Sequence, residues 1–403
     1  MRTAPLRYLA AVNERVLPED TPSDFTFKYV DISQVDSNGT VTIPADDTAF
    51  GAAPSRARRL AEPGSAVVST VRTYLRAIAT VPPARDPLVF STGFAVLRPL
   101  RMESRFFGYA CRSDAFVNEV VARSVGVSYP AISPNDLLDI HLPTPDPEEQ
   151  RRIADFLDDR LFRIDQITDA RRHQAVLLDL ARTETLRQLT GGERDASTWS
   201  HPRVAHVFRT GSGSTPPSDR LEYYDGGVPW VNTGDVRDGL LLATARTVTD
   251  AALKTIPTLV QHPAGSLVIA MYGQGATKGR AAMLATSACV NQACCVLIGD
   301  SLHTRWAFHW FRAHKREIVE LANGAGQPNL SQEIIRNVRM ALPPDRDIGR
   351  LLDEIEERED QSAEIQKALS RQIRLLQEFK QSLITAAVAG ELDVSTSGSG
   401  IPG

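Results

Sequence analysis

Two long stretches of the chain carry apolar residues at helical spacing on a strongly charged background. The first opens at Asp146, a good N-cap, and continues with Pro147, which suits a first helical position. Beyond that point neither glycine nor proline appears until Gly191. The apolar stripe contains Ile153, Leu157, Leu161, Ile164, Ile167, Leu177 and Ala181. This spacing predicts one amphipathic helix over residues 146–192.

The second stretch begins at Pro343-Pro-Asp-Arg346 and ends near Gly390. Its stripe contains Ile348, Leu352, Ile355, Ser362, Ile365, Leu369, Ile373, Leu376, Phe379 and Leu383. The spacing again predicts a long helix, over residues 344–393. The remaining residues, 394–403, are small and polar, and we expect them to form a disordered tail.

The rest of the sequence consists of short apolar and β-branched runs bounded by Gly, Pro, Asp and Ser. The clearest runs are Phe27–Val30, Ala66–Thr70 and Phe94–Leu97, and then Trp230–Asn232, Leu267–Met271 and Cys294–Ile298. Such runs predict strands, and helical spacing recurs in Ala115–Val125 and Trp306–Leu321. Residues 1–145 and 196–343 are therefore predicted to form two α/β (α+β) globular domains, joined through a Ser/Thr/Gly/Asp-rich linker around 190–200.

The second half of the chain repeats the first. Tyr29-Val-Asp-Ile-Ser-Gln-Val35 returns 201 residues later as Trp230-Val-Asn-Thr-Gly-Asp-Val236, and Gly64-Ser-Ala-Val-Val-Ser69 returns at the same offset as Gly265-Ser-Leu-Val-Ile-Ala270. Further on, Pro130-Ala-Ile-Ser133 matches Pro328-Asn-Leu-Ser331 at an offset of 198. Because the offset drifts by only a few residues, the chain is a duplicated unit, each copy followed by a helix. A bivalent binding protein fits this organisation better than an enzyme with one active site.

A helix of this length with a single apolar face needs a partner in water. The other long helix is the obvious partner. Equivalent positions in a duplicated chain predict an antiparallel, coiled-coil-like pair with a pseudo-twofold axis, separating the two globular domains.

Composition and charge restrict the function further. No apolar run approaches the roughly 18 residues that a membrane span needs, and the N-terminus lacks the apolar core of a signal peptide. Four cysteines without zinc spacing favour a reduced, metal-free cytoplasmic protein. The net charge is −4, yet residues 196–344 carry 14 basic and 10 acidic side chains, while both predicted helices are acidic. If nucleic acid is bound, the globular domains should bind it.

We find no catalytic or metal-binding constellation in the sequence. The Pro-Pro pairs lack the flanking residues of an amino-methyltransferase motif, and the histidines have neither a nucleophile nor metal spacing. Gly273-Gln-Gly-Ala-Thr-Lys-Gly279 is not a P-loop, because its lysine precedes the last glycine. A glycine-rich turn is the default interpretation of that segment, and a basic turn near DNA phosphate is the functional one.

The repeated segments resemble the specificity subunit of type I restriction–modification enzymes. The segments that carry the resemblance are Tyr29–Ser33, Gly64–Arg76, Gly211–Pro217, Glu222–Tyr224, Gly227–Asp235, Asn291–Ala293, Gln327–Ser331, Pro145–Ile153 and Leu383–Leu392. They follow the family's order from about residue 5 to 393. The last two resemble the family's central and distal conserved regions.

The resemblance implies that each domain is a target-recognition domain that reads one half-site of a bipartite, asymmetric sequence in double-stranded DNA. The helix pair would set the gap between half-sites and dock two methyltransferase subunits. S-adenosylmethionine would then bind to those subunits, and ATP and Mg to the full complex, so that the chain itself needs no cofactor. Whether a restriction/translocase subunit joins is left open.

Candidate contact residues follow from the chemistry of DNA reading, which needs Arg, Lys, Asn or Gln on presented loops. The DNA-binding candidates are Lys28, Arg72, Tyr74, Arg76, Gln274, Lys278, Arg280, Lys315 and Arg316. The partner-binding candidates on the helices are Ile153, Leu157, Leu161, Ile365, Leu369, Leu376 and Phe379. Two alternatives remain at this point: a stand-alone two-domain DNA binder, and a helical scaffold that binds protein without recognising DNA.

Overall fold

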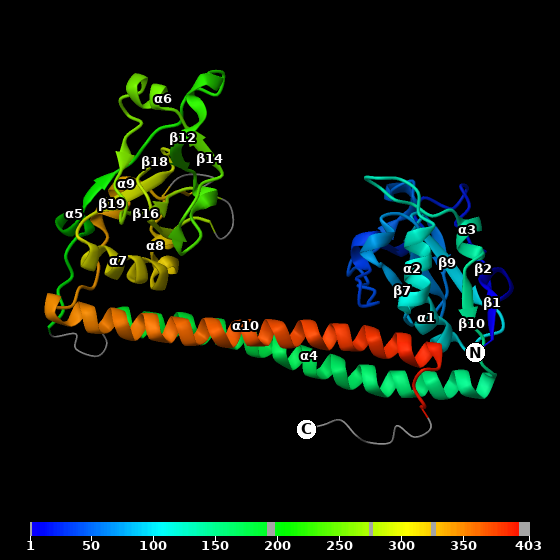
Figure 1. Cartoon of the computed structure of the whole chain (residues 1–403). Helices are drawn as coiled ribbons and strands as arrows, with labels where there is room; N and C mark the ends of the chain where they lie inside the picture. The colour runs from blue at the N-terminus through cyan, green and yellow to red at the C-terminus, as the bar shows by residue number, and fades with distance from the viewer. Residues whose placement is uncertain (1, 192–197, 274–276, 324–327, 395–403) are drawn as a thin grey trace. The chain divides into compact units, whose positions relative to one another are not determined.

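The computed structural model describes residues 2–191, 198–273, 277–323 and 328–394, so all of the predicted tail 394–403 except its first residue lies outside the described residues. The chain divides into two compact units (Figure 1). One contains residues 1–173 together with 369–403, and the other contains residues 174–368. Each unit therefore combines one globular domain with parts of both long helices.

The first domain contains two four-stranded sheets and a short two-stranded ribbon. In spatial order, the first sheet is β2 (Ala10–Val12), β9 (Phe94–Pro99), β6 (Ala66–Ser69) and β7 (Ile78–Thr80). The second is β4 (Thr48–Ala49), β3 (Thr26–Val30), β8 (Leu88–Ser91) and β5 (Ala57–Ala61). The ribbon pairs β1 (Thr3–Pro5) with β10 (His141–Pro143). The helices are α1 (Ser104–Arg112), α2 (Asp114–Ala122) and α3 (Pro134–Leu138).

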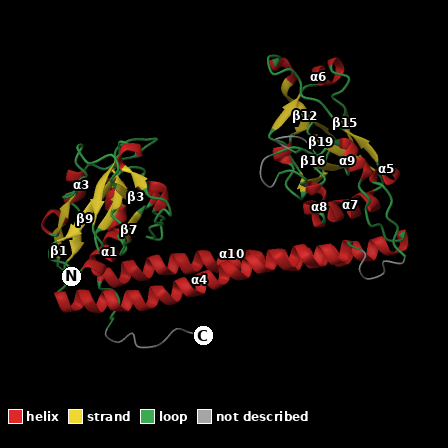
Figure 2. Ribbon diagram, turned by 180° about the vertical axis from the view of Figure 1, so that it is seen from behind, coloured by secondary structure: helices red, strands yellow, loops and turns green. Residues whose placement is uncertain are grey.

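The second domain contains a five-stranded and a four-stranded sheet (Figure 2). The first is β11 (Arg209–Gly211), β19 (Cys294–Ile298), β16 (Leu267–Ala270), β17 (Ala281–Leu284) and β13 (Leu240–Leu241). The second is β14 (Arg246–Val248), β12 (Tyr224–Val231), β18 (Ala288–Val290) and β15 (Gln261–His262). The helices are α5 (Val204–Val207), α6 (Asp250–Thr255), α7 (Ser301–Ala313), α8 (Lys315–Glu320) and α9 (Gln332–Asn337).

The two domains have the same strand order, which confirms the internal repeat. The order β2-β9-β6-β7 corresponds to β11-β19-β16-β17, to which the second domain adds β13. Each second sheet contains one parallel pair among antiparallel neighbours: β3 with β8, and β12 with β18. Gly64 and Gly265 precede the equivalent strands β6 and β16 with φ of +83° and +80°, a conformation that glycine adopts without strain.

The repeated Pro-x-x-Ser segment has the same structural role in both copies. Its third residue donates a backbone hydrogen bond to the segment after the central strand, from Ile132 to Thr70 at 2.9 Å and from Leu330 to Met271 at 3.1 Å. The serine then caps the next helix, α3 or α9, by accepting a backbone N–H with its side chain. These shared residues therefore build the fold.

The two long helices are α4 (Pro147–Thr190) and α10 (Asp345–Ala389). At the start of α4, the Asp146 carboxylate accepts the backbone N–H groups of Glu148 and Glu149 at 3.0 and 2.9 Å. Helix α10 ends at Gly390, whose φ of +74° suits a left-handed C-terminal cap. Among the described residues, no helix is long and apolar enough to cross a membrane.

Within each unit the helices pack with opposite direction, as predicted. In the first unit, Ile153, Leu157 and Leu161 of α4 share a core cluster with Ile384 and Val388 from the C-terminal part of α10. The Lys380 ammonium also contacts the Asp165 carboxylate at 2.6 Å. In the second unit the C-terminal part of α4 shares a cluster with the N-terminal part of α10. From the two helices this cluster contains Leu186, Leu189, Ile348, Leu351, Leu352 and Ile355.

Buried positions on the two helices repeat at an offset of 198 residues. The equivalent pairs are Ile153 and Leu351, Ala154 and Leu352, Leu157 and Ile355, Leu186 and Ile384, and Leu189 and Ala387. The helices therefore belong to the duplicated unit, and each packs against both domains, one at each of its ends.

Candidate nucleic-acid interface and helix surfaces

The segment after β6 contains two strained arginines. Arg72 and Arg76 flank a short 3-10 helix, Thr73–Leu75, and both have left-handed backbone, with φ of +50° and +55°. A side-chain-bearing residue rarely adopts this conformation, and two such residues within five positions cost on the order of 1–3 kcal/mol each. The surrounding contacts must therefore hold this segment in place.

Those contacts come from the loop between α2 and α3. The Thr73 and Ser124 hydroxyls lie 2.7 Å apart, and the Arg72 backbone N–H donates to the Pro130 carbonyl at 2.8 Å. The Arg72 guanidinium also lies 4.8 Å from the centre of the Tyr129 ring. Residues 70–76 and 124–131 thus form one structural element, which we call the first tip.

Two of the DNA-binding candidates in the first domain have structural roles. Arg76 forms an ion pair with Asp114. Lys28 contacts the Asp47 carboxylate at 2.7 Å and donates to the Ala45 carbonyl at 2.5 Å, and only 13% of its side chain is exposed. Lys28 is thus nearly covered and paired in this structure, and its assignment as a DNA contact stays a prediction. Tyr74 and Arg72, in contrast, are exposed.

Asp114 also links the first tip to α10. The Gln381 amide donates to Asp114 at 3.2 Å, the Thr385 hydroxyl donates to it at 3.3 Å, and the backbone N–H of Asp114 donates to Thr385 at 3.0 Å. Arg76 is therefore part of a network that fixes the first tip relative to the end of α10.

In the second domain, three of the basic candidates, Lys278, Lys315 and Arg316, line a hollow of about 600 Å³ to which α4 and α8 contribute. The Lys278 ammonium donates to the Pro328 carbonyl. Arg280 lies 3.8 Å from Asp238. Burial lowers the pKa of Lys315, although the charge of Asp238 raises it. Gln274 lies outside the described residues.

Arg316 lines the same hollow with a side chain that is 90% exposed, and its guanidinium lies 3.4 Å from Glu320. A pair this exposed contributes little to stability and leaves the cation accessible to phosphate. Lys278, Lys315 and Arg316 are thus brought together, which the sequence alone did not indicate.

The described residues contain no group of three or more metal-ligating side chains. The four cysteines are buried and unpaired. Burial raises the pKa of the thiols of Cys289 and Cys295 to about 11 and about 12, which disfavours the reactive thiolate.

Charged side chains attach the first domain to α4. Arg105 of α1 contacts Glu103 at 2.9 Å, Asp155 at 2.8 Å and Asp158 at 2.7 Å. The Tyr109 hydroxyl donates to Asp158 at 2.5 Å. Burial, together with this carboxylate, raises the pKa of Tyr109. We call this the first joint.

The second joint repeats this arrangement between α7 and α10. Arg305 contacts Glu356 at 2.5 Å, and Arg312 contacts both carboxylate oxygens of Glu359, at 2.9 and 2.7 Å. His309 occupies the position of Tyr109, 3.6 Å from Glu359 and 4.0 Å from Glu356.

Titration at the second joint is perturbed in two ways. Burial lowers the pKa of His309 to about 4. Burial alone would raise the pKa of Glu359, but the hydrogen bonds and charge of Arg312 lower it overall. At neutral pH, the joint therefore contains an uncharged histidine beside an ionised carboxylate.

The predicted partner-binding stripe is largely occupied by the chain itself. Ile153, Leu157, Leu161 and Leu369 are buried, and Leu376 is half-buried. Ile153, Leu157 and Leu161 belong to the core cluster of the first unit, and Leu376 packs against it. The structure uses these residues for internal packing, and the assignment of the stripe to a partner surface stays a prediction. Only Ile365 and Phe379 of that set are exposed, by 49% and 57%.

The structure shows a different set of exposed apolar positions on the helices. Ile167 and Ile365 are equivalent at the offset of 198, as are Leu177 and Leu375, and all four are exposed. A comparison of the two helices at that offset finds these pairs in the sequence, but it finds buried pairs such as Leu157 and Ile355 as well, so only the structure distinguishes them. Repeated exposure of apolar side chains indicates two equivalent contact surfaces.

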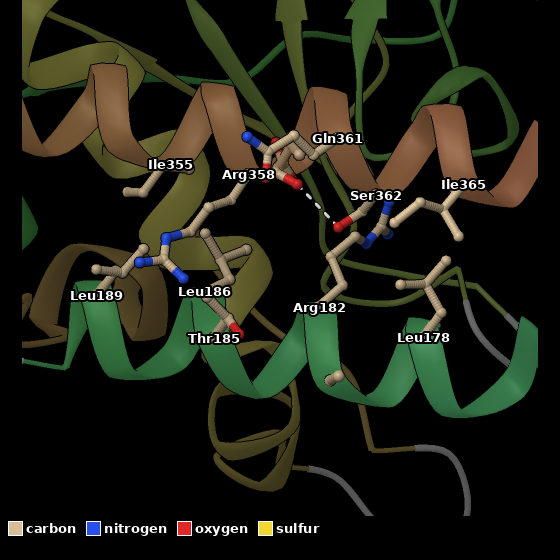
Figure 3. Close-up of a pocket in the computed structure, with 12 residues that line it drawn as sticks. Leu178, Arg182, Thr185, Leu186, Leu189, Ile355, Arg358, Gln361, Ser362 and Ile365 are labelled. Carbon is tan, nitrogen blue, oxygen red and sulfur yellow. Dashed lines mark hydrogen bonds between the residues drawn. The ribbon is translucent and has the colours of Figure 1, made fainter. Parts of the chain in front are cut away.

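The hollow between α4 and α10 in the second unit is less suited to binding (Figure 3). Its volume is about 180 Å³, and Leu186, Leu189 and Ile355 form part of its apolar wall. The Ser362 hydroxyl donates to the Arg358 carbonyl at 2.8 Å, within α10. This small space lies where α4 and α10 are slightly further apart, and we do not assign a ligand to it.

Comparison with known proteins decides the family. The sequence family described as "Type I restriction modification DNA specificity domain" matches residues 60–175 and 196–384, more than half of the chain and once in each copy. The chain belongs to this family. It is a non-catalytic specificity subunit whose domains recognise DNA, and members of the family assemble with methyltransferase subunits.

Individual relatives agree with this assignment. The chain is 21% identical over 330 residues to the type I restriction enzyme MjaIX specificity subunit of Methanocaldococcus jannaschii, covering 77% of this chain and 74% of the relative. A solved structure from a study of complex assembly and conformational transition in a type I R-M system has a TM-score of 0.76 and 25% identity, covering 97% and 98% of the two chains. The HsdS subunit of Thermoanaerobacter tengcongensis, with a TM-score of 0.51, 24% identity and 97% coverage of both chains, supports the fold.

Proposed function

We propose that this specificity subunit reads a bipartite, asymmetric site in double-stranded DNA, with one half-site for each domain. The observation that carries the proposal is a repeated fold with different side chains at corresponding loops. At the offset of 201, Arg72 of the first tip corresponds to Gly273 in the second domain. Two readers with one fold and different contact residues suit two different half-sites.

We further propose that two methyltransferase subunits dock on the helices, one for each copy of the repeat. The equivalent exposed pairs Ile167 with Ile365 and Leu177 with Leu375 support this number, because a duplicated surface offers two similar contacts. Methyl transfer to adenine, with bound S-adenosylmethionine, takes place in those subunits, and ATP and Mg are needed only by a restriction/translocase subunit. The complex acts on DNA in the cytoplasm.

A domain exchange tests the proposal. Residues 201–342 are replaced by the second domain of another specificity subunit, and the hybrid is expressed with its methyltransferase subunits. Sequencing that detects methylated adenine should show one half-site changed and the other retained. If both half-sites change, or if neither does, the assignment of one half-site to each domain is wrong.

Binding measurements distinguish the alternatives. A protein-binding scaffold would give a complex with no salt-dependent affinity for duplex DNA. A stand-alone DNA binder would bind its site with the same affinity and specificity in the absence of methyltransferase subunits.

A further inference from the structure

The first tip presents an apolar surface that packing of the domain does not explain. Val127 is fully exposed, Val125 and Tyr129 are 80% and 66% exposed, and Tyr74 and Leu75 of the 3-10 helix are also exposed. A cluster of large apolar side chains on a loop marks a contact surface in a soluble domain.

This surface is rigidly built. Val125 and Ala131 exchange two backbone hydrogen bonds, at 2.8 and 3.0 Å, so that the loop between them forms a closed hairpin. Gly126, with φ of +116°, allows the chain to reverse there. The hairpin is joined to the 3-10 helix through the hydroxyls of Thr73 and Ser124. Val127 and Tyr129 are therefore presented on a fixed support.

Arg72 places a positive charge beside the apolar surface of the first tip. Its guanidinium stacks on the Tyr129 ring, which leaves the N–H donors at its edge free to point outward. No carboxylate pairs with it among the residues that the structure describes. A stacked arginine of this kind is preorganised for a planar acceptor pair, and guanine O6 and N7 are the base edge that accepts two N–H groups from arginine.

The second domain has a different sequence at the equivalent loops. At the offset of 201 Gly273 replaces Arg72, and at the offset of 198 Ala325, which lies outside the described residues, replaces Val127. The apolar and aromatic side chains of the first tip are thus specific to the first domain. Of its supporting hydrogen bonds, the exchange between Val125 and Ala131 recurs between Asn323 and Asn329, whereas the Thr73–Ser124 bond cannot recur because Ala322 stands at the position of Ser124.

We propose that the first tip determines the specificity of the first half-site by reading a guanine with Arg72 and the C5-methyl group of an adjoining thymine with Val127. Tyr129 is a positioning residue that holds the guanidinium by its face. This inference deepens the proposed function and rests on it. The chemistry is that of the major groove, where the thymine methyl group is the apolar feature and guanine presents two acceptors.

The test uses the full chain assembled with its methyltransferase subunits. Methylation mapping first gives both half-sites, and binding to duplexes with single-base changes is then measured for the wild type, Arg72→Ala, Arg72→Lys and Val127→Ser. Arg72→Ala should reduce discrimination at one guanine of the first half-site by about tenfold or more. Arg72→Lys should retain the salt dependence but lose most of that discrimination. Arg85→Ala, an exposed arginine of the same domain outside the first tip, is the matched control and should leave the specificity unchanged.

A second measurement isolates the methyl contact. Replacing the adjoining thymine by 2′-deoxyuridine should weaken wild-type binding about fourfold, and Val127→Ser should abolish that difference. Tyr129→Ala should also lower discrimination at the guanine, because it removes the support of the Arg72 guanidinium. The double variant Arg72→Ala/Tyr129→Ala should therefore discriminate no less than Arg72→Ala alone.

Four outcomes would overturn the inference. The half-site could lack a guanine beside a thymine, Arg72→Ala could weaken binding equally on all sequences, or Val127→Ser could leave the methyl effect intact. The variants could also keep normal methylation while losing a protein partner, which would make the first tip a protein-binding surface. If the wild-type complex instead methylates no bipartite site, the proposed function fails, and that result is recognisable without any variant.

Discussion

Acidification should destabilise the second unit through His309. This histidine of α7 is enclosed at the second joint between Glu356 and Glu359 of α10 and beside Arg305 and Arg312 of its own helix. Burial and the two arginines lower its pKa, and the two carboxylates only partly offset this effect. The folded protein therefore favours the neutral imidazole.

The sign and the size of the change in unfolding free energy follow from proton linkage. With a pKa of about 4 in the folded state against an ordinary value of 6.5, His309 binds fewer protons when folded. Its contribution is fully present above pH 6.5 and is lost progressively as the pH falls toward 4. At about pH 5 the expected loss in unfolding free energy is on the order of 2 kcal/mol.

The chain provides a selective assay for this effect. All four of its tryptophans lie between residues 199 and 310, in the second domain. Tryptophan fluorescence during urea unfolding therefore reports that domain alone. The unfolding free energy is compared at about pH 7.5 and pH 5 for the wild type and for His309→Gln, which keeps a polar group but cannot titrate in this range. His201→Gln removes an exposed histidine of the same domain and controls for histidine loss as such.

Between pH 7.5 and pH 5 the unfolding free energy of the wild type should fall by about 2 kcal/mol more than that of His309→Gln, because all other titrating groups are common to both proteins. Equal losses of unfolding free energy in the two proteins would show that His309 does not cause the acid destabilisation. A larger loss in His309→Gln would mean that the carboxylates of Glu356 and Glu359 dominate and that the imidazole is charged in the folded state.

Three further predictions concern the helices. Ile365→Asp should yield complexes with one methyltransferase subunit in place of two, seen by native mass spectrometry; retention of both would argue against docking at this surface. Arg105→Ala should cost about 1 kcal/mol, since its ion pairs are partly exposed, and should speed amide exchange in α1; unchanged exchange would contradict a role at the first joint. Inserting seven residues after residue 173 and after residue 371 should lengthen the gap between half-sites by about 3 base pairs, from about 1.5 Å per helical residue and 3.4 Å per base pair; an unchanged gap in methylation maps would exclude the helices as its determinant.

The long-period patterns in the sequence predicted the large elements well. The helical stripe of α4 persists for many turns, and a register maintained over that length leaves few alternatives. The repeat offset of about 200 residues makes β6 equivalent to β16 and β9 equivalent to β19, and the matching strand orders agree. The helical stripe and the repeat offset each rest on many residues, so one residue that departs from the pattern does not change the prediction.

Side-chain roles that depend on distant contacts were less predictable. Lys28 looked like a free cation, but Asp47 and the Ala45 carbonyl lie across the sheet edge from it. Tyr129 was missed as a site residue because its relation to Arg72 arises from a backbone hydrogen bond between loops about 58 residues apart. The one available signal was its position beside Pro130, in a repeated motif.

The apolar stripe shows why helical pattern does not by itself identify a partner surface. Leu157 and Phe379 both belong to such a stripe, yet the first is fully buried and the second is 57% exposed. Each long helix uses much of its apolar face to pack against the globular domains. The repeat separates the two uses, because positions buried in both copies belong to the core clusters, whereas positions exposed in both copies are available to partners.

The two copies have diverged unequally, and the pattern of divergence is itself an argument about function. Arg105 and Arg305 are equivalent at the joints, and each contacts a carboxylate that is also equivalent, Asp158 or Glu356. The backbone exchange between Val125 and Ala131 of the first tip recurs between Asn323 and Asn329, whereas the sequences of the equivalent loops differ. Holding a domain on its helix is the same physical task in both copies, whereas reading two different half-sites is not. A duplicated protein under these two demands should retain its joints and vary its loops, as the equivalent ion pairs of the joints and the different loop sequences indicate.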